Sequence, residues 1–295
     1  MSGKVKALVL AGFGINCDYE TTYALRLAGA ETDRLHLNEV IARSRAGRGL
    51  ESYHLLAVDG GFAWADDHGA GVILGLKLRA YLGEQIEKFI ADGKLIIGIC
   101  NGFQALVNMG LLPGFAGNYQ DRSVALAAND CGNFRNQWVY LTVEPDNRCL
   151  FTRGLENIEL PVRHGEGKFY AEPAVIERLK DQGQVVMRYG RPVPKPHRRG
   201  QPQAAPPRPD VVPAEGQFPY NPNGSLFDIA GVCDETGRVF GLMPHPEAYH
   251  HLTNHPDWTS RVDHSRRWGQ PSPDLEGEGL KILRNAVSYC AENLL

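Results

Sequence analysis

Strand-length apolar runs alternate with segments of helical spacing near the start of the chain. The apolar runs lie at 4–10, 53–59 and 93–99. One helical segment begins near Asp18 and ends at Gly29, and another runs from Gly71 to Asp92. A helix that returns the chain to a second strand favours parallel pairing of the two strands. The sequence therefore predicts an α/β fold with an open, mostly parallel sheet and helices on both faces.

Later apolar runs predict strands of a more hairpin-like kind, so the sheet is expected to be mixed. These runs are WVYLTV at 138–143, QVVMRY at 184–189 and GRVFGLM at 237–243. A short strand is also expected around Leu35 and Leu37. A closing amphipathic helix is expected from the helical spacing of Leu280, Leu283, Val287, Cys290 and Leu294.

Composition limits the class of protein. The chain has 295 residues, 43% of them hydrophobic, which is enough for one large domain or two small ones, and we expect a single domain over residues 1–295. A net charge of −3 with interspersed acidic and basic residues argues against nucleic acid and anionic membranes as partners. No segment reaches about 18 apolar residues, so a cytoplasmic protein is expected. Six cysteines without CxxC spacing indicate free thiols.

A proline-rich stretch between about 191 and 222 interrupts the pattern. It holds ten of the nineteen prolines together with several arginines. Because proline lacks an amide donor and ends regular structure, we expect a loop insertion exposed to solvent. A partner-binding arm is the alternative interpretation.

A cysteine stands at the end of the strand at 93–99. Gly98-Ile99-Cys100-Asn101-Gly102 has the form of a nucleophile elbow, in which a strand turns sharply into a helix. The glycines allow neighbouring chains to approach the strained turn. We expect the Cys100 thiol to project outward, exposed, at a helix N-terminus that favours the thiolate. The pattern predicts a catalytic nucleophile rather than a buried structural cysteine.

A thiol nucleophile needs a proton-transfer partner and an oxyanion hole. His245 follows a predicted strand between two prolines, and Glu247 is placed to hold its imidazole tautomer. Backbone N–H groups can stabilise the negative charge of a tetrahedral intermediate. The turn at Gly61 and Phe62 is expected to supply one such donor, and Asn101 the other.

These features resemble the class I, triad-type glutamine amidotransferases, and within them the glutaminase subunits of phosphoribosylformylglycinamidine synthases. The similar stretches are GINCDYET (14–21), DGGFAWADDHGAG (59–71), GICNGFQALVNMGLLPG (98–114), PVRHGEGKFY (161–170) and MPHPEAYHHLTNHPDW (243–258). The resemblance implies an open, flavodoxin-like α/β sheet. It implies that Cys100 attacks the side-chain amide of glutamine, that His245 moves protons and is oriented by Glu247, and that Gln104 helps to hold the substrate.

The resemblance also implies partners. Ammonia would pass through a protein interior to a synthetase subunit that makes formylglycinamidine ribonucleotide in purine biosynthesis, and a small third subunit would bridge the two. ATP and magnesium are expected in the synthetase, with no cofactor or metal in this chain. The sequence departs from the family pattern at Cys131, Asn133, Arg135 and Gln137. These departures leave open the support of the glutamine pocket or the docking of subunits there.

Other interpretations remain open. Gly12-x-Gly14 after a strand suggests a dinucleotide site, but Cys17 stands where the third glycine is needed. Four histidines between His245 and His255 suggest a metal site without matching ligand spacing. A catalytically silent docking module and a thiol hydrolase or redox protein of the same fold are further alternatives.

Overall fold

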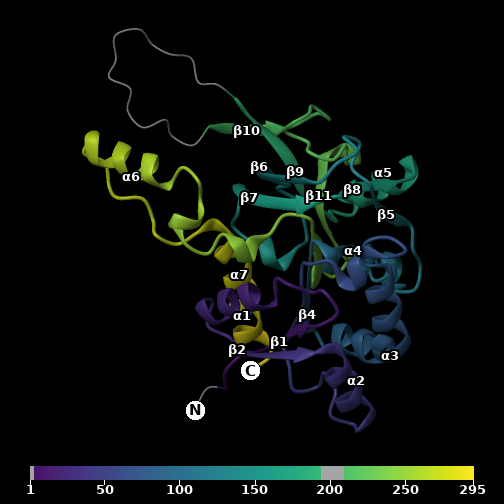
Figure 1. The fold of residues 1–295 in the computed structure, drawn as a ribbon. Coiled ribbons are helices and arrows are strands. Elements are labelled where there is room, and N and C mark those ends of the chain that lie inside the picture. The colour runs from purple at the N-terminus through teal and green to yellow at the C-terminus, as the bar shows by residue number, and fades with distance from the viewer. Residues whose placement is uncertain (1–2, 194–208) are drawn as a thin grey trace.

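A mixed ten-stranded sheet forms the centre of the computed structural model, which describes residues 3–193 and 209–295 (Figure 1). The strand order is β2-β1-β3-β4-β12-β11-β9-β6-β7, and β10 pairs with β9. The strands of this sheet are β1 (Lys6–Ala11), β2 (Glu31–His36), β3 (Leu55–Val58), β4 (Leu95–Ile99), β6 (Arg135–Val143), β7 (Asn157–His164), β9 (Val185–Val193), β10 (Asp210–Pro213), β11 (Ile229–Cys233) and β12 (Val239–Leu242). A separate two-stranded sheet joins β5 (Val124–Ala127) to β8 (Lys168–Ala171).

The sheet has a parallel half and an antiparallel half that meet at β12. Strands β2, β1, β3, β4 and β12 pair in parallel, whereas β11 pairs antiparallel with both β12 and β9. Every residue of β3 and β4 is buried, as expected for parallel strands covered on both faces. The mixed α/β fold is therefore as predicted.

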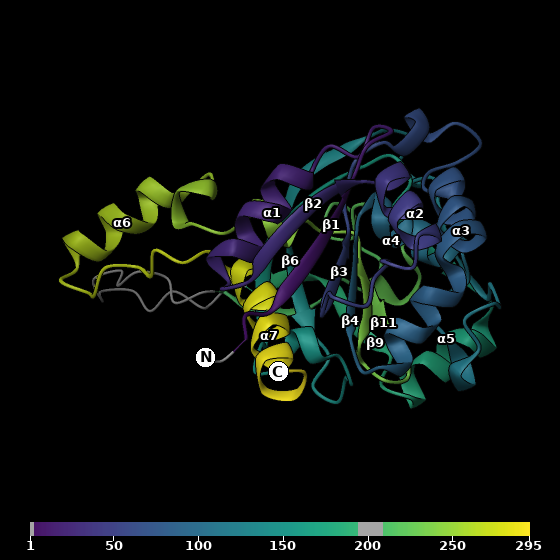
Figure 2. The ribbon, with the colours of Figure 1, turned by 90° about the horizontal axis from the view of Figure 1, so that it is seen from below.

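Helices cover both faces of the parallel half (Figure 2). The helices are α1 (Asp18–Leu27), α2 (Leu37–Arg45), α3 (Val72–Ala91), α4 (Asn101–Asn108), α5 (Pro173–Asp181), α6 (Trp258–Arg267) and α7 (Glu278–Asn293). On one side α1 packs against α7, and on the other α3 packs against α2 and α4. In both views α6 lies away from the sheet. The helices predicted near 18–29, at 71–92 and at the end of the chain are confirmed as α1, α3 and α7.

The predicted strand around Leu35 and Leu37 is wrong in its position. Strand β2 ends at His36, and Leu37 is already the first residue of α2. The His36 side chain accepts a hydrogen bond from the Asn38 amide at 3.2 Å and so caps the helix. A side-chain cap therefore ends the strand where apolar alternation alone suggested that it continued.

The proline-rich stretch is not a loop at its ends. Strand β9 continues to Val193, and β10 returns antiparallel to it, with Asp210 opposite Val193. Farther on, the buried Asn221 side chain donates hydrogen bonds to the Ser225 carbonyl and to Asp228, both at 2.9 Å. The expected loop is thus narrower than predicted, and its middle, 194–208, lies outside the described residues.

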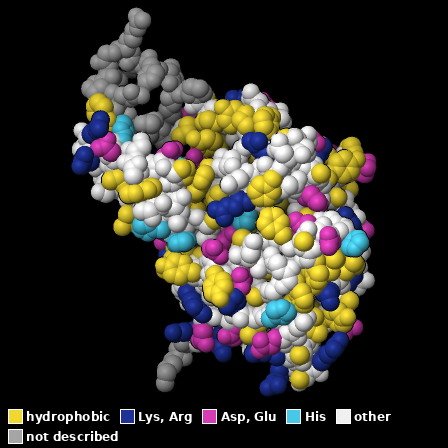
Figure 3. All heavy atoms as spheres, viewed as in Figure 1, with side chains coloured by type: hydrophobic (Ala, Val, Ile, Leu, Met, Phe, Trp, Pro, Cys, Tyr) yellow, Lys and Arg dark blue, Asp and Glu magenta, His cyan; other side chains and the backbone are white. Residues whose placement is uncertain are grey.

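Three further features of the described residues concern surface charge, helix hydropathy and the cysteines. Acidic and basic side chains are interspersed on the face shown in Figure 3, rather than gathered by sign. Within residues 3–193 and 209–295 we find no helix both long enough and apolar enough to cross a membrane. All six cysteines are free thiols, as predicted.

Candidate functional site

Cys100 occupies a strained turn between β4 and α4. Its backbone has φ +50° and ψ −106°, a conformation that L-residues rarely adopt. A Cβ atom on Gly102 would lie 1.8 Å from the Val58 carbonyl oxygen, and one on Gly98 would lie 2.6 Å from the Leu106 side chain. The two glycines are therefore steric requirements of the elbow, as the sequence predicts.

The prediction that the Cys100 thiol is exposed is wrong. Only 5% of the residue is accessible, and its Sγ lies 3.6 Å from the carbonyl oxygen of Arg163 on β7. The antiparallel half of the sheet covers the elbow because β7 ends beside it. In this conformation the thiol therefore faces the end of β7 rather than open solvent.

Strand pairing brings His245 to the elbow although 145 positions separate it from Cys100. Strands β4 and β12 are parallel neighbours, with Ile99 opposite Leu242. The Cys100 amide donates to the Leu242 carbonyl at 2.8 Å, and the His245 amide donates to the Pro161 carbonyl at 2.9 Å. Backbone hydrogen bonds thus join the elbow to β12 and join His245 to β7 in the antiparallel half of the sheet.

The His245 imidazole and the Glu247 carboxylate form a buried ion pair. Nδ1 of His245 lies 2.6 Å from Oε1 of Glu247, and the residues are 2% and 1% exposed. Burial alone would lower the pKa of His245, but the charges of Glu247 and Cys100 and contact with Cys17 raise it well above its ordinary value. Among the described residues the buried Nε2 has no hydrogen-bond partner. The Cys100 thiol is nevertheless near enough to the ring to raise the pKa of His245 by its charge and by hydrogen bonding, so Nε2 is the ring nitrogen left for the nucleophile.

The predicted oxyanion donors differ in their availability. The Phe62 amide already donates to the Gly14 carbonyl at 2.9 Å. Gly61, at φ +149°, has no acceptor for its N–H among the described residues. The Asn101 N–H is the first of α4 and so has no intrahelical acceptor. In this conformation Gly61 and Asn101 can supply donors, whereas Phe62 would need a change of the turn.

The side chain of Asn101 ties the turn after β3 to the elbow. Its Oδ1 accepts from the Ala63 amide at 3.1 Å, and its Nδ2 donates to Asp66 at 3.0 Å and to Gln104 Oε1 at 2.9 Å. The Gln104 amide group in turn donates to the carbonyl oxygen of Glu166. Gln104 is 3% exposed, so in this conformation it positions the surrounding loops rather than facing open solvent.

Two acidic residues lie beside this network. Burial raises the pKa of Asp66 to about 6, and the nearby Glu166 carboxylate adds to the shift. Glu166 accepts a hydrogen bond from the Ala70 amide at 3.0 Å. The sequence showed Glu166 only as part of the HGEGKF stretch, without a role. Its place beside Gln104 could not be derived from spacing alone.

Cys17 is a site residue that our reasoning from the sequence missed. It is half-buried, and its Sγ lies 3.9 Å from Nδ1 of His245. Burial raises the pKa of its thiol, and the hydrogen bond to His245 opposes that shift. The sequence signal is its position in the GINCDYET stretch, which carries the family resemblance but assigns no role to Cys17.

The other histidines of the suggested metal cluster have separate partners. His250 Nδ1 contacts the Glu247 carbonyl at 3.1 Å, and His251 Nδ1 contacts the Thr253 hydroxyl at 2.8 Å. His255 lies 3.6 Å from Glu159. These imidazoles do not converge with His245 on one point, so the four-histidine site is not formed.

Three of the four residues that depart from the family pattern contact the end of the proline-rich stretch. The guanidinium of Arg135 lies 5.0 Å from the ring centre of Phe218. Gln137 donates to the Pro219 carbonyl at 2.9 Å, and the Cys131 thiol lies 3.8 Å from the Pro222 carbonyl. The departures and the insertion therefore occur together in one contact.

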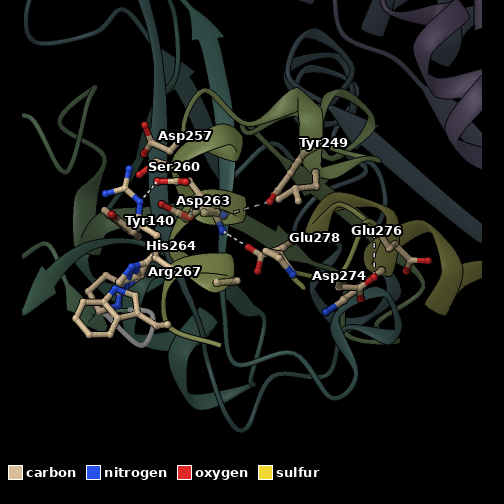
Figure 4. Close-up of a pocket in the computed structure, with 18 residues that line it drawn as sticks. Tyr140, Tyr249, Asp257, Ser260, Asp263, His264, Arg267, Asp274, Glu276 and Glu278 are labelled. Carbon is tan, nitrogen blue, oxygen red and sulfur yellow. Dashed lines mark hydrogen bonds and ion pairs between the residues drawn. The ribbon is translucent and has the colours of Figure 1, made fainter. Parts of the chain in front are cut away.

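A cavity of about 830 Å³ lies elsewhere, beside α6 (Figure 4). Side chains of α6 and of the segment leading into α7 surround it, including Asp263, Arg267 and Glu276. No residue of the triad lines this cavity. The chemistry of the elbow is therefore separate from it.

Comparison with known proteins identifies the class to which this site belongs. A family model for the CobB/CobQ-like glutamine amidotransferase domain matches residues 4–290. The chain therefore belongs to the glutamine amidotransferase family. It is 42% identical over 289 residues to the phosphoribosylformylglycinamidine synthase subunit PurQ of Dehalococcoides mccartyi, covering 98% of this chain and 99% of that relative. The PurQ of Methanococcus maripaludis strain S2 is 38% identical over 284 residues, or 96% and 97% of the two chains.

Solved structures give the same result. A chain in the structure of PurLQS from Thermotoga maritima matches with a TM-score of 0.64 and 29% identity, covering 97% of this chain and 99% of that chain. A GMP synthase protein from Thermoplasma acidophilum matches at 15% identity with a TM-score of 0.50, covering 98% and 96% of the two chains, which shows a shared fold. The predicted resemblance and fold class are confirmed.

Proposed function

We propose that this chain is the glutaminase subunit of a phosphoribosylformylglycinamidine synthase and acts in purine biosynthesis. The observation that carries the proposal is the buried His245–Glu247 pair beside the Cys100 elbow. The near full-length likeness to relatives named PurQ supports the particular synthase. The substrate of this chain is glutamine, and its products are glutamate and ammonia.

Cys100 begins the reaction by losing its thiol proton to Nε2 of His245. The sulfur attacks the side-chain amide carbon of glutamine, and the N–H groups of Gly61 and Asn101 stabilise the oxyanion that forms. His245 returns the proton to the departing nitrogen, which leaves as ammonia and gives a thioester. Glu247 keeps Nδ1 protonated and stabilises the imidazolium during both transfers.

Water completes the cycle. Nε2 of His245 takes a proton from a water molecule, whose oxygen attacks the thioester carbon. The tetrahedral intermediate expels the Cys100 sulfur, which regains the proton, and glutamate leaves. Asn101 and Gln104 hold the surrounding turns in place through their buried hydrogen bonds.

The partners follow from the fate of ammonia. In neutral water ammonia is mostly protonated and is no longer a nucleophile, so this chain delivers it directly to a synthetase subunit. ATP and magnesium belong to that synthetase, and a small third subunit bridges the two. The likeness to a chain of PurLQS from Thermotoga maritima supports such an assembly.

Substitution of the nucleophile tests the proposal. In the complex purified from the native cell, Cys100→Ala should abolish glutamine hydrolysis, whereas ammonia should still support the synthetase reaction. Cys131→Ala is the matched control, because its thiol is only partly buried and contacts Asn133 rather than the triad. Equal glutaminase activity of wild type and Cys100→Ala would rule out Cys100 as the nucleophile, and no activity in either would indicate a catalytically silent docking module. Turnover of a thioester or amide other than glutamine, with no synthetase recovered, would instead indicate a thiol hydrolase.

A further inference from the structure

Cys17 lies on the side of the His245 imidazole that the proposed reaction does not use. Its Sγ is 3.9 Å from Nδ1, the nitrogen that also contacts Glu247. A Cβ atom on Gly60 would lie 2.8 Å from Cε1 of His245 and 3.2 Å from Sγ of Cys17. Glycine at position 60 therefore leaves the thiol and the imidazole in direct contact.

Three different metal-ligating atoms meet at this point. One ligand atom each from Cys17, His245 and Glu247 lie within 4.8 Å of one another. Glu247 is 1% exposed, and its second carboxylate oxygen has no hydrogen-bond partner among the described residues. Sulfur, imidazole nitrogen and carboxylate oxygen are ligands of zinc, which is four-coordinate and keeps one position for water in open sites.

We propose that Cys17, His245 and Glu247 form a binding site for a thiophilic divalent cation such as Zn²⁺, and that the bound cation stops glutamine hydrolysis. The binding site stands on its own geometry, whereas the inhibition rests on the proposed function. Neighbouring ligand atoms in a tetrahedral zinc site lie roughly 3.3–3.6 Å apart, from bond lengths of about 2.0–2.3 Å. The Sγ–Nδ1 distance of 3.9 Å must shorten slightly, and the Nδ1–Oε1 distance of 2.6 Å must lengthen.

Binding exchanges protons for the metal. Cys17 releases its thiol proton to solvent, and the proton of the neutral imidazole moves from Nδ1 to Nε2 as the metal binds Nδ1. A water molecule from the mouth of the site takes the fourth position beside the half-buried Cys17. Because Nε2 then already carries a proton, it no longer accepts the proton of Cys100. The cation therefore blocks activation of the nucleophile without touching it.

Cobalt is the probe for binding, because a Co²⁺–thiolate bond gives a charge-transfer absorption that zinc lacks. Cys100→Ala should bind one Co²⁺ per chain with this absorption. Cys17→Ala should lose the absorption, and its affinity for Zn²⁺ should fall by more than about 100-fold, since even supporting partners of ligands are worth roughly 10–100-fold. Cys131→Ala should behave as wild type.

Inhibition is measured relative to the basal rate of each variant. Zn²⁺ should inhibit wild type and Cys131→Ala at similar concentrations, and Cys17→Ala only at far higher ones. Cys17→Ser provides a second variant, with circular dichroism as the check of folding. Loss of the Co²⁺ absorption in Cys100→Ala, or its persistence in both Cys17 variants, would overturn the metal site. A Cys17-dependent absorption in a wild-type complex that hydrolyses no glutamine would keep the site and overturn only the proposed function.

Discussion

Nδ1 of His245 and Oε1 of Glu247 lie 2.6 Å apart, and both residues are almost closed to water. A buried imidazolium would be costly if it were isolated. The carboxylate offsets that cost and fixes the ring so that Nε2 is the nitrogen available to the elbow. The pair therefore sets both the charge and the orientation of the proposed base.

Glu247→Gln should leave the fold and the ring orientation largely intact but remove the negative charge. Glutamine hydrolysis should fall by roughly 10²–10⁴-fold, as expected when a triad carboxylate becomes an amide.

The pKa of His245 should also fall in Glu247→Gln, because the charge of Glu247 is the largest of the causes that raise it. Stability gained from a raised histidine pKa is present at low pH and lost as the pH rises through the folded-state value, so the variant should lose stability at low pH. Steady-state assays and NMR titration of His245 provide the measurements, with the exposed Glu177→Gln as control. An unchanged rate would contradict the role of Glu247.

Gly102→Ala should disrupt the elbow. A Cβ atom there would lie 1.8 Å from the Val58 carbonyl oxygen, and the backbone on both sides must shift to relieve the contact. Gly83→Ala is the matched control, because it lies in α3 with open space around its Cβ position. That change should stabilise the protein by about 0.5–1 kcal/mol. The free energy of unfolding of both variants can be measured by urea titration. A smaller loss of stability in Gly102→Ala than in Gly83→Ala would contradict the steric argument.

Asn101→Ala should separate the turn after β3 from the elbow. The side chain is fully buried and bonds to Ala63, Asp66 and Gln104. Leaving these partners unsatisfied should cost about 2–4 kcal/mol, and the rate of glutamine hydrolysis should fall as well. Asn285→Ala is the comparison, since that side chain donates two hydrogen bonds to backbone carbonyls but lies on α7, away from the elbow. Equal effects of both variants on the rate would argue against a positioning role for Asn101.

Asp59→Asn should reduce the dependence of stability on pH. Burial raises the pKa of Asp59 well above its ordinary value, and Glu247 and Asp18 add to the shift. As the pH rises, Asp59 loses its proton in the unfolded chain at a lower pH than in the folded protein. The free energy of unfolding of wild type therefore falls above about pH 3.9, by up to about 1.4 kcal/mol per pH unit. The side-chain amide of Asp59→Asn does not titrate. The Tm of the variant minus the Tm of wild type should therefore increase from pH 4 to pH 7.

Asp92→Asn provides a control of opposite sign for the Asp59 experiment. Its carboxylate bonds to Lys88, which lowers its pKa, so ionised Asp92 adds to stability above the unfolded-state pKa. The Tm of Asp92→Asn should therefore fall relative to that of wild type as the pH rises. A parallel response of the two variants would show that global charge, rather than burial of Asp59, sets the trend.

Local sequence patterns predicted the parts of the fold that depend on local chemistry. The helical spacing before Asp92 and the glycines around Cys100 gave α3 and the elbow correctly, because each reflects constraints within a few residues. The end of β2 at His36 depends on one side-chain cap. Helix α6 has only Ser265 buried, so it shows no apolar stripe that a sequence pattern could detect.

The rest of the site depends on contacts between distant segments. The burial of Cys100 results from the Arg163 carbonyl on a strand whose pairing no local pattern reveals. Likewise, the hydrogen bond from the Phe62 amide to the Gly14 carbonyl joins two loops that are distant in the sequence. Cys17 was overlooked because its contact with His245 joins segments that are 228 positions apart in the sequence, one after β1 and one after β12. The roles of the triad were predicted from residue types, but their accessibility was not.

The pairing of β4 with β12 has a consequence for how this chain can vary in length. Cys100 directly follows β4, and His245 lies three residues beyond the end of β12, so a single register, Ile99 opposite Leu242, aligns them. Segments added or removed between the two strands leave that alignment untouched if they leave the sheet at strands that border neither β4 nor β12. The β9–β10 hairpin is such a place, and an extension there lengthens the protein without displacing either end of the proton path.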